Sequence, residues 1–358
     1  MKTLPSLFPA TADGARLGLG GASLGNLFEA MSDEQAQAVV AAAVRSGCRV
    51  FDTAPHYGNG LSEQRMGGAL RGIARDGFVL SSKVGRVLEP DAQAPRNQHG
   101  YVQVLPFRQR WDFSASGIRT SVQMSLQRLG LTRLDIAYIH DCDALTHGSA
   151  YQQVLHQVVH SALPELRRMQ TEGLVGAVGL GVNDVQVCLD VLAHTELDCL
   201  LLAGRYSLLD QSAIEQLLPL CVQRGVQVAL GGVFNSGILA TGVGAGVGAG
   251  AGVPRFNYAP AAQHWVERTR CLQAVCDQFG VPLRAAALQF PLAHAAIQTV
   301  VLGAAQPAHW SDAIAMMRTP IPTEFWHALR VQGLLPDAAP TPAPLALSTA
   351  RSSMEPGL

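Results

Sequence analysis

Short apolar runs alternate with longer amphipathic stretches along most of this chain. The short runs have the length and apolar character of buried strands, whereas the longer ones carry helix signals. This alternation predicts a parallel sheet whose strands are joined by right-handed helical crossovers. Eight segments fit the strand pattern: residues 16–21, 48–52, 78–83, 134–139, 175–181, 198–206, 226–231 and 298–302.

The number of these units indicates the architecture. Eight strand–helix units within about 320 residues fit a closed (β/α)8 TIM barrel better than an open doubly wound sheet. We therefore expect a single α/β domain over residues 1–335. Polar residues suited to capping mark three of the expected helix starts: Ser32 with Gln35 before residues 36–44, Ser62 with Glu63, and Asp210 before residues 211–223.

Three segments interrupt the alternation. Residues 86–113 form a long connection after the third strand, where it would roof the active site of a barrel. The glycine-rich run 242–253 predicts a flexible loop, because its spacing does not match the G-x-G-x-x-G dinucleotide fingerprint. The Pro- and Ala-rich tail 336–358 predicts disorder.

Composition restricts the class of partner. The chain has 358 residues, of which 48% are hydrophobic and 15% charged, and its net charge is −1. It contains no Lys/Arg-rich run, whereas nucleic acids and anionic membranes require clustered positive charge. We therefore expect a small-molecule partner, with no nucleic acid and no membrane.

Two features favour a cytoplasmic protein. The first residues include prolines where a signal peptide needs a long apolar segment, and no stretch of 18 apolar residues follows. The seven cysteines are scattered and never spaced as Cys-x-x-Cys, which is typical of reduced, buried thiols. The spacing gives no zinc motif, so no metal site is expected.

Lysine is rare in this chain. Besides Lys2 it contains only Lys83, against 24 arginines. Lys83 ends the strand-like run 78–83, and α/β folds place catalytic residues at the carboxyl ends of parallel strands. An ammonium is compact and its pKa shifts readily, whereas a guanidinium stays charged and planar. Lys83 is therefore a candidate catalytic residue, the alternative being a lysine that extends from a strand end to solvent.

Polar residues also end two neighbouring strands. Asp52 ends the second strand, Tyr57 follows it in a loop, and His140 ends the fourth. Neighbouring strand ends meet at the rim of a barrel, so these side chains should converge on Lys83. The set suits proton transfer by a tyrosine, because Lys83 would lower the pKa of the phenol and Asp52 would pair with the lysine. His140 would orient the reacting oxygen.

At these four residues the chain resembles the aldo-keto reductases, whose Asp, Tyr, Lys and His tetrad has this order and these strand positions. The resemblance covers nearly the whole folded part. It includes residues 17–25 (LGLGGASLG), 51–63 (FDTAPHYGNGLSE), 125–131 (SLQRLGL) and 288–292 (LQFPL). Residues 203–211 (AGRYSLLDQ) and 231–239 (GGVFNSGIL) are similar to the subgroup of L-fucose and D-threo-aldose 1-dehydrogenases, and pyridoxal 4-dehydrogenase is similar too.

The resemblance implies a role for each matching position. Tyr57 would be the general base in oxidation and the acid in reduction, tuned by Lys83 and Asp52 and assisted by His140. Tyr206 would stack under a nicotinamide, its alternative being a half-buried tyrosine at the rim. The other implied cofactor residues are Asn183 at the carboxamide, Gln211, Phe234, Ser236 and Leu239 around the pyrophosphate, and Gly303 and His309 after the eighth strand. Candidate substrate residues are His56, Trp111 and Asp141.

The run after the eighth strand bears on the choice of cofactor. NADPH-preferring members commonly carry a lysine or arginine there, because the 2′-phosphate needs charge-assisted partners. Residues 302–312 contain neither, and His309 is only weakly protonated at neutral pH. The resemblance therefore implies NAD, with NADP as the alternative, and a preference for the oxidative direction.

Three functions follow from the resemblance. The first is oxidation of an aldose at C1 to the lactone, with L-fucose, D-arabinose or L-galactose as the type of substrate. The second is a reductase or dehydrogenase of aldehydes or ketones such as pyridoxal. The third, a non-catalytic cofactor-binding subunit, is disfavoured by the intact tetrad and by the lack of an extension for docking a partner.

Overall fold

Eight parallel strands close into a barrel in the computed structural model of the chain, which describes residues 6–12, 14–244 and 253–343. Around the barrel the order is β1, β12, β9, β8, β7, β6, β3 and β2, and β2 pairs again with β1. All eight predicted strands are present, which confirms the TIM barrel. Their bounds are Leu17–Gly20 (β1), Val50–Asp52 (β2), Val79–Val84 (β3), Leu134–His140 (β6), Val175–Val182 (β7), Cys199–Ala203 (β8), Gln227–Gly231 (β9) and Ile297–Gly303 (β12).

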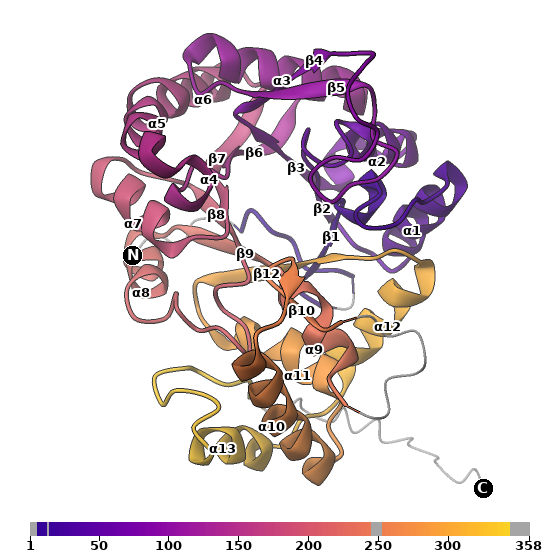
Figure 1. Cartoon of the computed structure of the whole chain (residues 1–358), viewed down its shortest axis with the longest axis vertical. Coiled ribbons are helices and arrows are strands. Elements are labelled where there is room, and N and C mark those ends of the chain that lie inside the picture. The colour runs from indigo at the N-terminus through magenta and orange to yellow at the C-terminus, as the bar shows by residue number, and fades with distance from the viewer. Residues whose placement is uncertain (1–5, 13, 245–252, 344–358) are drawn as a thin grey trace, which may run out of the picture.

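The helices lie outside the strands and surround the barrel (Figure 1). Their apolar faces and the outer faces of the strands form one large core, so the barrel is a single domain. The helices are α1 (Asp33–Arg45), α2 (Leu61–Leu70), α3 (Ala115–Leu129), α4 (Ala144–His147), α5 (Tyr151–Gln157), α6 (Leu163–Thr171), α7 (Val185–His194), α8 (Leu217–Arg224), α9 (Ile238–Thr241), α10 (Gln263–Phe279), α11 (Leu283–Gln289), α12 (Pro307–Arg318) and α13 (Thr323–Val331).

The amino end of the barrel is closed by the segment before β1. Strand side chains that point inward form a separate apolar cluster around Tyr138 and Leu201, and Phe8 packs into it. The amide of Leu7 donates to Oε1 of Gln227, the first residue of β9, at 2.8 Å. Because side chains fill the amino end, a cavity in the barrel can open only at the carboxyl end, which is where barrel enzymes have their active sites.

The first two predicted helix starts differ in their capping. Ser32 caps α1 as predicted, because its Oγ accepts from the amide of Gln35 at 3.2 Å. The prediction for Ser62 and Glu63 was wrong, since α2 begins after Gly60, which has a left-handed conformation. Ser62 and Glu63 instead belong to the buried face of α2, and both are fully buried.

The helix predicted after Asp210 begins later than expected. α8 starts at Leu217, and residues 212–216 form turns. Asp210 binds Arg205 at 2.9 Å and accepts from the amide of Ser212 at 2.9 Å. The carboxylate therefore caps a turn rather than a helix.

The predicted long loop over residues 86–113 contains an antiparallel hairpin. Its strands, β4 (Arg86–Pro90) and β5 (Phe107–Trp111), pair along their whole length and lie beside α3 at the top of Figure 1. A smaller hairpin, formed by β10 (Arg255–Phe256) and β11 (Ala259–Pro260), precedes α10. Both hairpins lie on connections that follow barrel strands, where they can contribute to the rim.

The two segments predicted to be flexible or disordered lie partly outside the described residues. Of the glycine-rich run 242–253, residues 245–252 lie outside them. The tail differs from the prediction at its start, because Ala339 is fully buried and its carbonyl accepts from Arg330 Nη2 at 2.7 Å. Residues 344–358 lie outside the described part.

The remaining sequence expectations concern thiols and membranes. All seven cysteines are free thiols, and six of them are buried. Within the described ranges, no helix has both the length and the apolar character needed to cross a membrane.

Candidate active site

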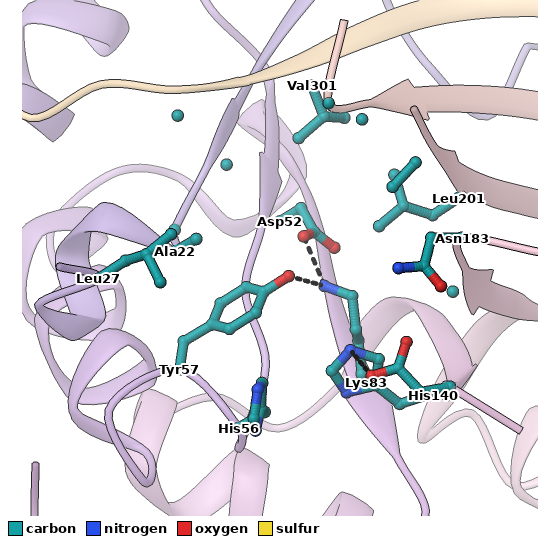
Figure 2. A pocket seen from close by; sticks show the side chains of 18 of the residues that line it. Ala22, Leu27, Asp52, His56, Tyr57, Lys83, His140, Asn183, Leu201 and Val301 are labelled. Atoms are coloured by element: carbon teal, nitrogen blue, oxygen red, sulfur yellow. Dashed lines mark hydrogen bonds and ion pairs between the residues drawn. The ribbon is translucent and has the colours of Figure 1, made fainter. Parts of the chain in front are cut away.

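Lys83 lies at the centre of the predicted tetrad, near the carboxyl end of β3. Its Nζ donates to Asp52 Oδ2 at 2.6 Å, to Thr53 O at 3.0 Å and to Tyr57 Oη at 3.0 Å. The ring of His140 is nearly perpendicular to that of Tyr57, with the centroids 6.3 Å apart. Figure 2 shows the four side chains around one space. The structure therefore brings the four predicted residues together.

The register of the barrel sets these positions. Asp52 pairs with Ser81 between β2 and β3, and Lys83 pairs with Tyr138 between β3 and β6. Ser81 Oγ donates to Asp52 Oδ1 at 2.7 Å, so each carboxylate oxygen has a donor. A Cβ at Gly181 of β7 would lie 3.3 Å from Lys83 Cε. The stem of the lysine therefore passes a glycine on its way to the rim.

Tyr57 reaches the site from the loop after β2. A Cβ at Gly25 would lie 2.5 Å from the backbone of Tyr57, so the loop requires glycine beside it. Burial raises the pKa of Tyr57 well above its usual value, and the Asp52 carboxylate raises it further. The direction is therefore opposite to the predicted one, chiefly because Tyr57 is buried and because the Asp52 carboxylate lies beside the lysine at 2.6 Å. Tyr57 is therefore a neutral phenol at pH 7.

His140 is a neutral ring in this structure. Burial lowers its pKa well below the usual value, and the charges of Arg86 and Lys83 act in the same direction. Its Nε2 lies 3.4 Å from Asp141 Oδ2, while its Nδ1 has no partner among the described residues. His140 lines the first cavity, and a neutral imidazole can share a hydrogen bond with a substrate oxygen there.

Two connected cavities, of about 470 Å³ each, open at this end of the barrel. The first surrounds the tetrad. The second extends past the ends of β9 and β12 to Gln306, the residue before α12. Both cavities are lined by Asn183, Tyr258 and Gly303, so they form one continuous trench.

Ten of the predicted site residues line this trench. They are Asp52, Tyr57, Lys83 and His140 of the tetrad, the substrate candidates His56 and Asp141, and the cofactor candidates Asn183, Phe234, Ser236 and Gly303. Of the cofactor candidates, Asn183 and Gly303 line both cavities, whereas Phe234 and Ser236 line only the second. Their placement is as expected, and their roles remain predictions.

Five predicted residues line neither cavity. Tyr206 is fully buried, and its ring packs against Phe290 with the centroids 5.2 Å apart, so it offers no face to the trench. Trp111 packs against the guanidinium of Arg86, whose carbon lies 3.9 Å from the centre of the indole. The other three are Leu239 in the core, Gln211 whose amide donates to Ser207 O, and His309, which is exposed in the first turn of α12.

Several residues at the site were not predicted, and Arg86 and Tyr258 are two of them. Arg86 donates to Asp141 Oδ2 at 2.8 Å and is largely buried. Its place directly after β3 was a usable signal, since a charged residue there must lie at the rim. Tyr258 lines both cavities from the turn of the β10–β11 hairpin, with a φ of 65°. No local pattern indicated it, because the contact depends on how this hairpin folds back over the barrel.

A family model agrees with this geometry. Residues 16–331 match the model described as the aldo/keto reductase family. The chain belongs to this family. The resemblance seen in the tetrad motifs is thereby confirmed, and this aldo/keto reductase is an oxidoreductase that takes a nicotinamide cofactor.

Individual relatives of this aldo/keto reductase cover nearly the whole chain. It is 39% identical to a pyridoxal 4-dehydrogenase of Microbacterium luteolum, over 89% of this chain and 94% of the relative. It is 37% identical to a D-threo-aldose 1-dehydrogenase of a Pseudomonas species, with the same two coverages of 89% and 94%. A solved glycerol dehydrogenase of Gluconobacter oxydans superimposes with a TM-score of 0.69 at 19% identity, over 92% of this chain and 93% of that one, which supports the fold.

Proposed function

We propose that this aldo/keto reductase oxidises an aldose at C1 to the lactone and passes the hydride to NAD⁺. The observation that carries the proposal is the 3.0 Å contact of Lys83 Nζ with Tyr57 Oη inside the first cavity. That cavity continues into a second one suited to an elongated cofactor. The relative named D-threo-aldose 1-dehydrogenase supports the choice of substrate class.

The tetrad side chains divide the proton chemistry between them. A bound NAD⁺ would accept the hydride from C1. Tyr57 takes the proton of the C1 hydroxyl, so that one hydrogen leaves as hydride and the other as a proton. Because burial raises its pKa, Tyr57 must first release its own proton to solvent through the open first cavity, and Lys83 Nζ stabilises the phenolate that remains. The neutral ring of His140 hydrogen-bonds the same oxygen and orients it.

The second cavity suits NAD⁺ better than NADP⁺. Gly232, Gly237 and Gly303 line it, so the backbone can approach a ligand closely, as a pyrophosphate requires. No lysine or arginine lines it within the described residues, whereas Glu29 does. A carboxylate repels a 2′-phosphate and can accept from ribose hydroxyls.

Initial rates with both cofactors test this function. The substrates are L-fucose, D-arabinose, L-galactose, L-xylose and pyridoxal. We expect kcat/KM to be at least about tenfold higher with NAD⁺, because no lysine or arginine of the described residues lines the second cavity to bind the phosphate. Gln306→Arg, which adds a cation at the start of α12, should raise kcat/KM with NADP⁺. Equal efficiency with the two cofactors would contradict the preference, and no turnover of any substrate would contradict the function itself.

The walls of the first cavity favour pyridoxal as a second candidate substrate. Tyr57 and Tyr101 stack with centroids 5.9 Å apart, and the ring of His56 stands edge-on to Tyr101 at 5.3 Å. Such aromatic walls accommodate a flat ring. The relative named pyridoxal 4-dehydrogenase supports this candidate, and the same panel of rates separates it from the sugars.

A further inference from the structure

His56 lies next to the position where the reacting oxygen would bind. It lines the first cavity, and its ring centroid is 5.7 Å from that of His140 and 6.2 Å from that of Tyr57. Figure 2 shows it close to both rings. A polar atom that His56 offers to the cavity would therefore meet a substrate group only a few bonds from the reacting carbon.

The orientation of the neighbouring Gln109 amide is fixed from two sides. Asn59 Nδ2 donates to two backbone carbonyls, at 3.2 and 2.7 Å, so Asn59 Oδ1 must be the acceptor that faces Gln109 Nε2 at 2.7 Å. On the other side, Arg86 Nη1 can only donate, and it meets Gln109 Oε1 at 3.1 Å. Both contacts place the oxygen of Gln109 toward Arg86 and its nitrogen toward Asn59.

This orientation decides which nitrogen of His56 carries the proton. Nδ1 of His56 lies 2.9 Å from Gln109 Oε1, which can only accept, so Nδ1 is the donor. The ring carries a single proton, because burial and the charge of Arg86 lower the pKa of His56 to about 3. Nε2 is therefore an unprotonated acceptor, and no described residue donates to it.

We propose that His56 Nε2 accepts a hydrogen bond from a substrate hydroxyl on the carbon next to the reacting one. The substrates selected are thus α-hydroxy aldehydes and their hemiacetals. The inference rests on the proposed function and names the feature by which its substrates are recognised. Gln109 and Arg86 act as positioning residues, since they hold the tautomer without reaching the substrate.

Asp141 lines the same cavity and anchors the network behind His56. Its Oδ2 receives Arg86 Nη2 at 2.8 Å and lies 3.4 Å from His140 Nε2, so this oxygen already has a donor. The ion pair also keeps Arg86 directed at Gln109. Asp141 thus orients Arg86, Arg86 orients the Gln109 amide, and Gln109 keeps the proton on His56 Nδ1. His56 Nε2 remains the acceptor that is offered to the substrate.

Three pentoses together measure what the hydroxyl at C2, next to the reacting carbon, contributes to kcat/KM. D-Arabinose and D-ribose differ only in the configuration at C2, and 2-deoxy-D-ribose matches both apart from lacking that hydroxyl. We expect wild-type kcat/KM to be at least about tenfold higher for one epimer than for the deoxy sugar, the value of one hydrogen bond at a buried acceptor. In His56→Phe this ratio should fall to near one, while turnover of the deoxy sugar persists. Pyridoxal has no hydroxyl on the carbon next to its aldehyde carbon, so turnover of pyridoxal without turnover of any sugar would overturn the inference.

Variants of Gln109 test the positioning. Gln109→Leu, which removes the acceptor from Nδ1, should lose most of the preference, whereas Gln109→Glu, which keeps an acceptor there, should retain it near pH 8. His194→Phe changes an exposed histidine of α7 and should leave the ratio as in the wild type. An unchanged ratio in His56→Phe would overturn the inference about His56 alone. A wild-type enzyme that oxidises none of the substrates would instead overturn the proposed function.

Discussion

The ammonium of Lys83 has three N–H donors, and three acceptors meet it. They are a carboxylate, a backbone carbonyl and the phenol of Tyr57, at 2.6, 3.0 and 3.0 Å. A guanidinium would bring five donors in a planar fork, which is too wide for a passage beside Gly181. The geometry therefore explains why a chain so rich in arginine has lysine at this position.

Loss of the Lys83 charge should abolish most turnover. Lys83→Met removes the cation that stabilises the phenolate of Tyr57, so kcat should fall by at least about 100-fold, the size of a general acid–base contribution. Steady-state rates measure this effect, and calorimetry with NAD⁺ should show that cofactor binding is retained. Arg168→Met, which removes an exposed cation from α6, serves as the control. Activity retained by Lys83→Met at neutral pH would contradict the assignment.

Which residues meet at the rim could be predicted, but the direction of their side chains could not. Asp52 and His140 end barrel strands, and Lys83 lies one residue before the end of β3, so position along the sequence sufficed. Tyr206 was expected to face a nicotinamide, yet it turns toward Phe290, which is remote in sequence. The pKa of Tyr57 was mispredicted for a similar reason, because burial depends on the whole surrounding shell.

At the scale of elements, a buried carboxylate joins α2 to α3 and β3. Glu63 is fully buried, accepts from Arg128 Nε at 2.6 Å and from Ser82 Oγ at 2.7 Å. Ser82 precedes Lys83, so this contact also holds the end of β3 that carries the ammonium. The same interaction explains the failed capping prediction: Glu63 is directed toward the core rather than toward the start of its helix.

Removal of this carboxylate should cost far more stability than removal of an exposed one. Glu63→Ala leaves Arg128 unpaired in the interior, so the free energy of unfolding should fall by about 3–5 kcal/mol. Asp76→Ala breaks an exposed pair with Arg133 and should cause no measurable loss. Urea denaturation compares the two, and Glu63→Gln provides a milder change if Glu63→Ala does not fold. Equal losses for Glu63→Ala and Asp76→Ala would contradict this account.

The alternation of strands and helices was predicted well because apolar residues are spaced differently in a strand and in a helix. The β4–β5 hairpin was missed although arginines alternate with other residues over 107–111, as in a strand with one exposed face. The two strands are separated by residues 91–106, a segment with no repeating pattern. Pairing at such a distance is a tertiary property, so a long loop was the natural expectation.

At the scale of the whole molecule, buried titratable groups couple the rim to the stability of the barrel. Burial and neighbouring cations lower the pKa of His56, to about 3, and that of His140, whereas both rings have a pKa near 6.5 when unfolded. Below about pH 6.5 the unfolded chain binds protons that the folded chain does not, so stability falls. Tyr57 and Tyr101, whose pKa values are raised, cause the opposite loss above about pH 10.

The acid side of this profile is directly testable. The free energy of unfolding in urea should decrease between pH 6 and pH 4, and His56→Phe should make the decrease shallower by up to about 1.4 kcal/mol per pH unit, the value of one proton. His194→Phe, in which the exposed histidine is replaced, should keep the wild-type slope. An equal slope in His56→Phe and the wild type would show that His56 is protonated in the folded enzyme.

The closed barrel could be predicted from the count of strand–helix units, but the lining of the trench could be predicted only in part. The connection 86–113 was expected to roof the site and supplies His99 and Tyr101, whereas other parts of the lining, spread between residues 20 and 306, carry no such signal. Tyr258 is an example, since it belongs to a short hairpin that is remote from the tetrad in sequence but lines both cavities.

The close passage of Lys83 beside Gly181 has a consequence for how this sequence can vary through evolution. A Cβ at this glycine would lie 3.2 Å from Tyr138 Cβ and 3.3 Å from Lys83 Cε, so even alanine would press on the stem of the lysine. Gly181 has no side chain to contribute to the reaction. The chemistry at the rim therefore restricts which residues fit at a position that takes no part in the reaction.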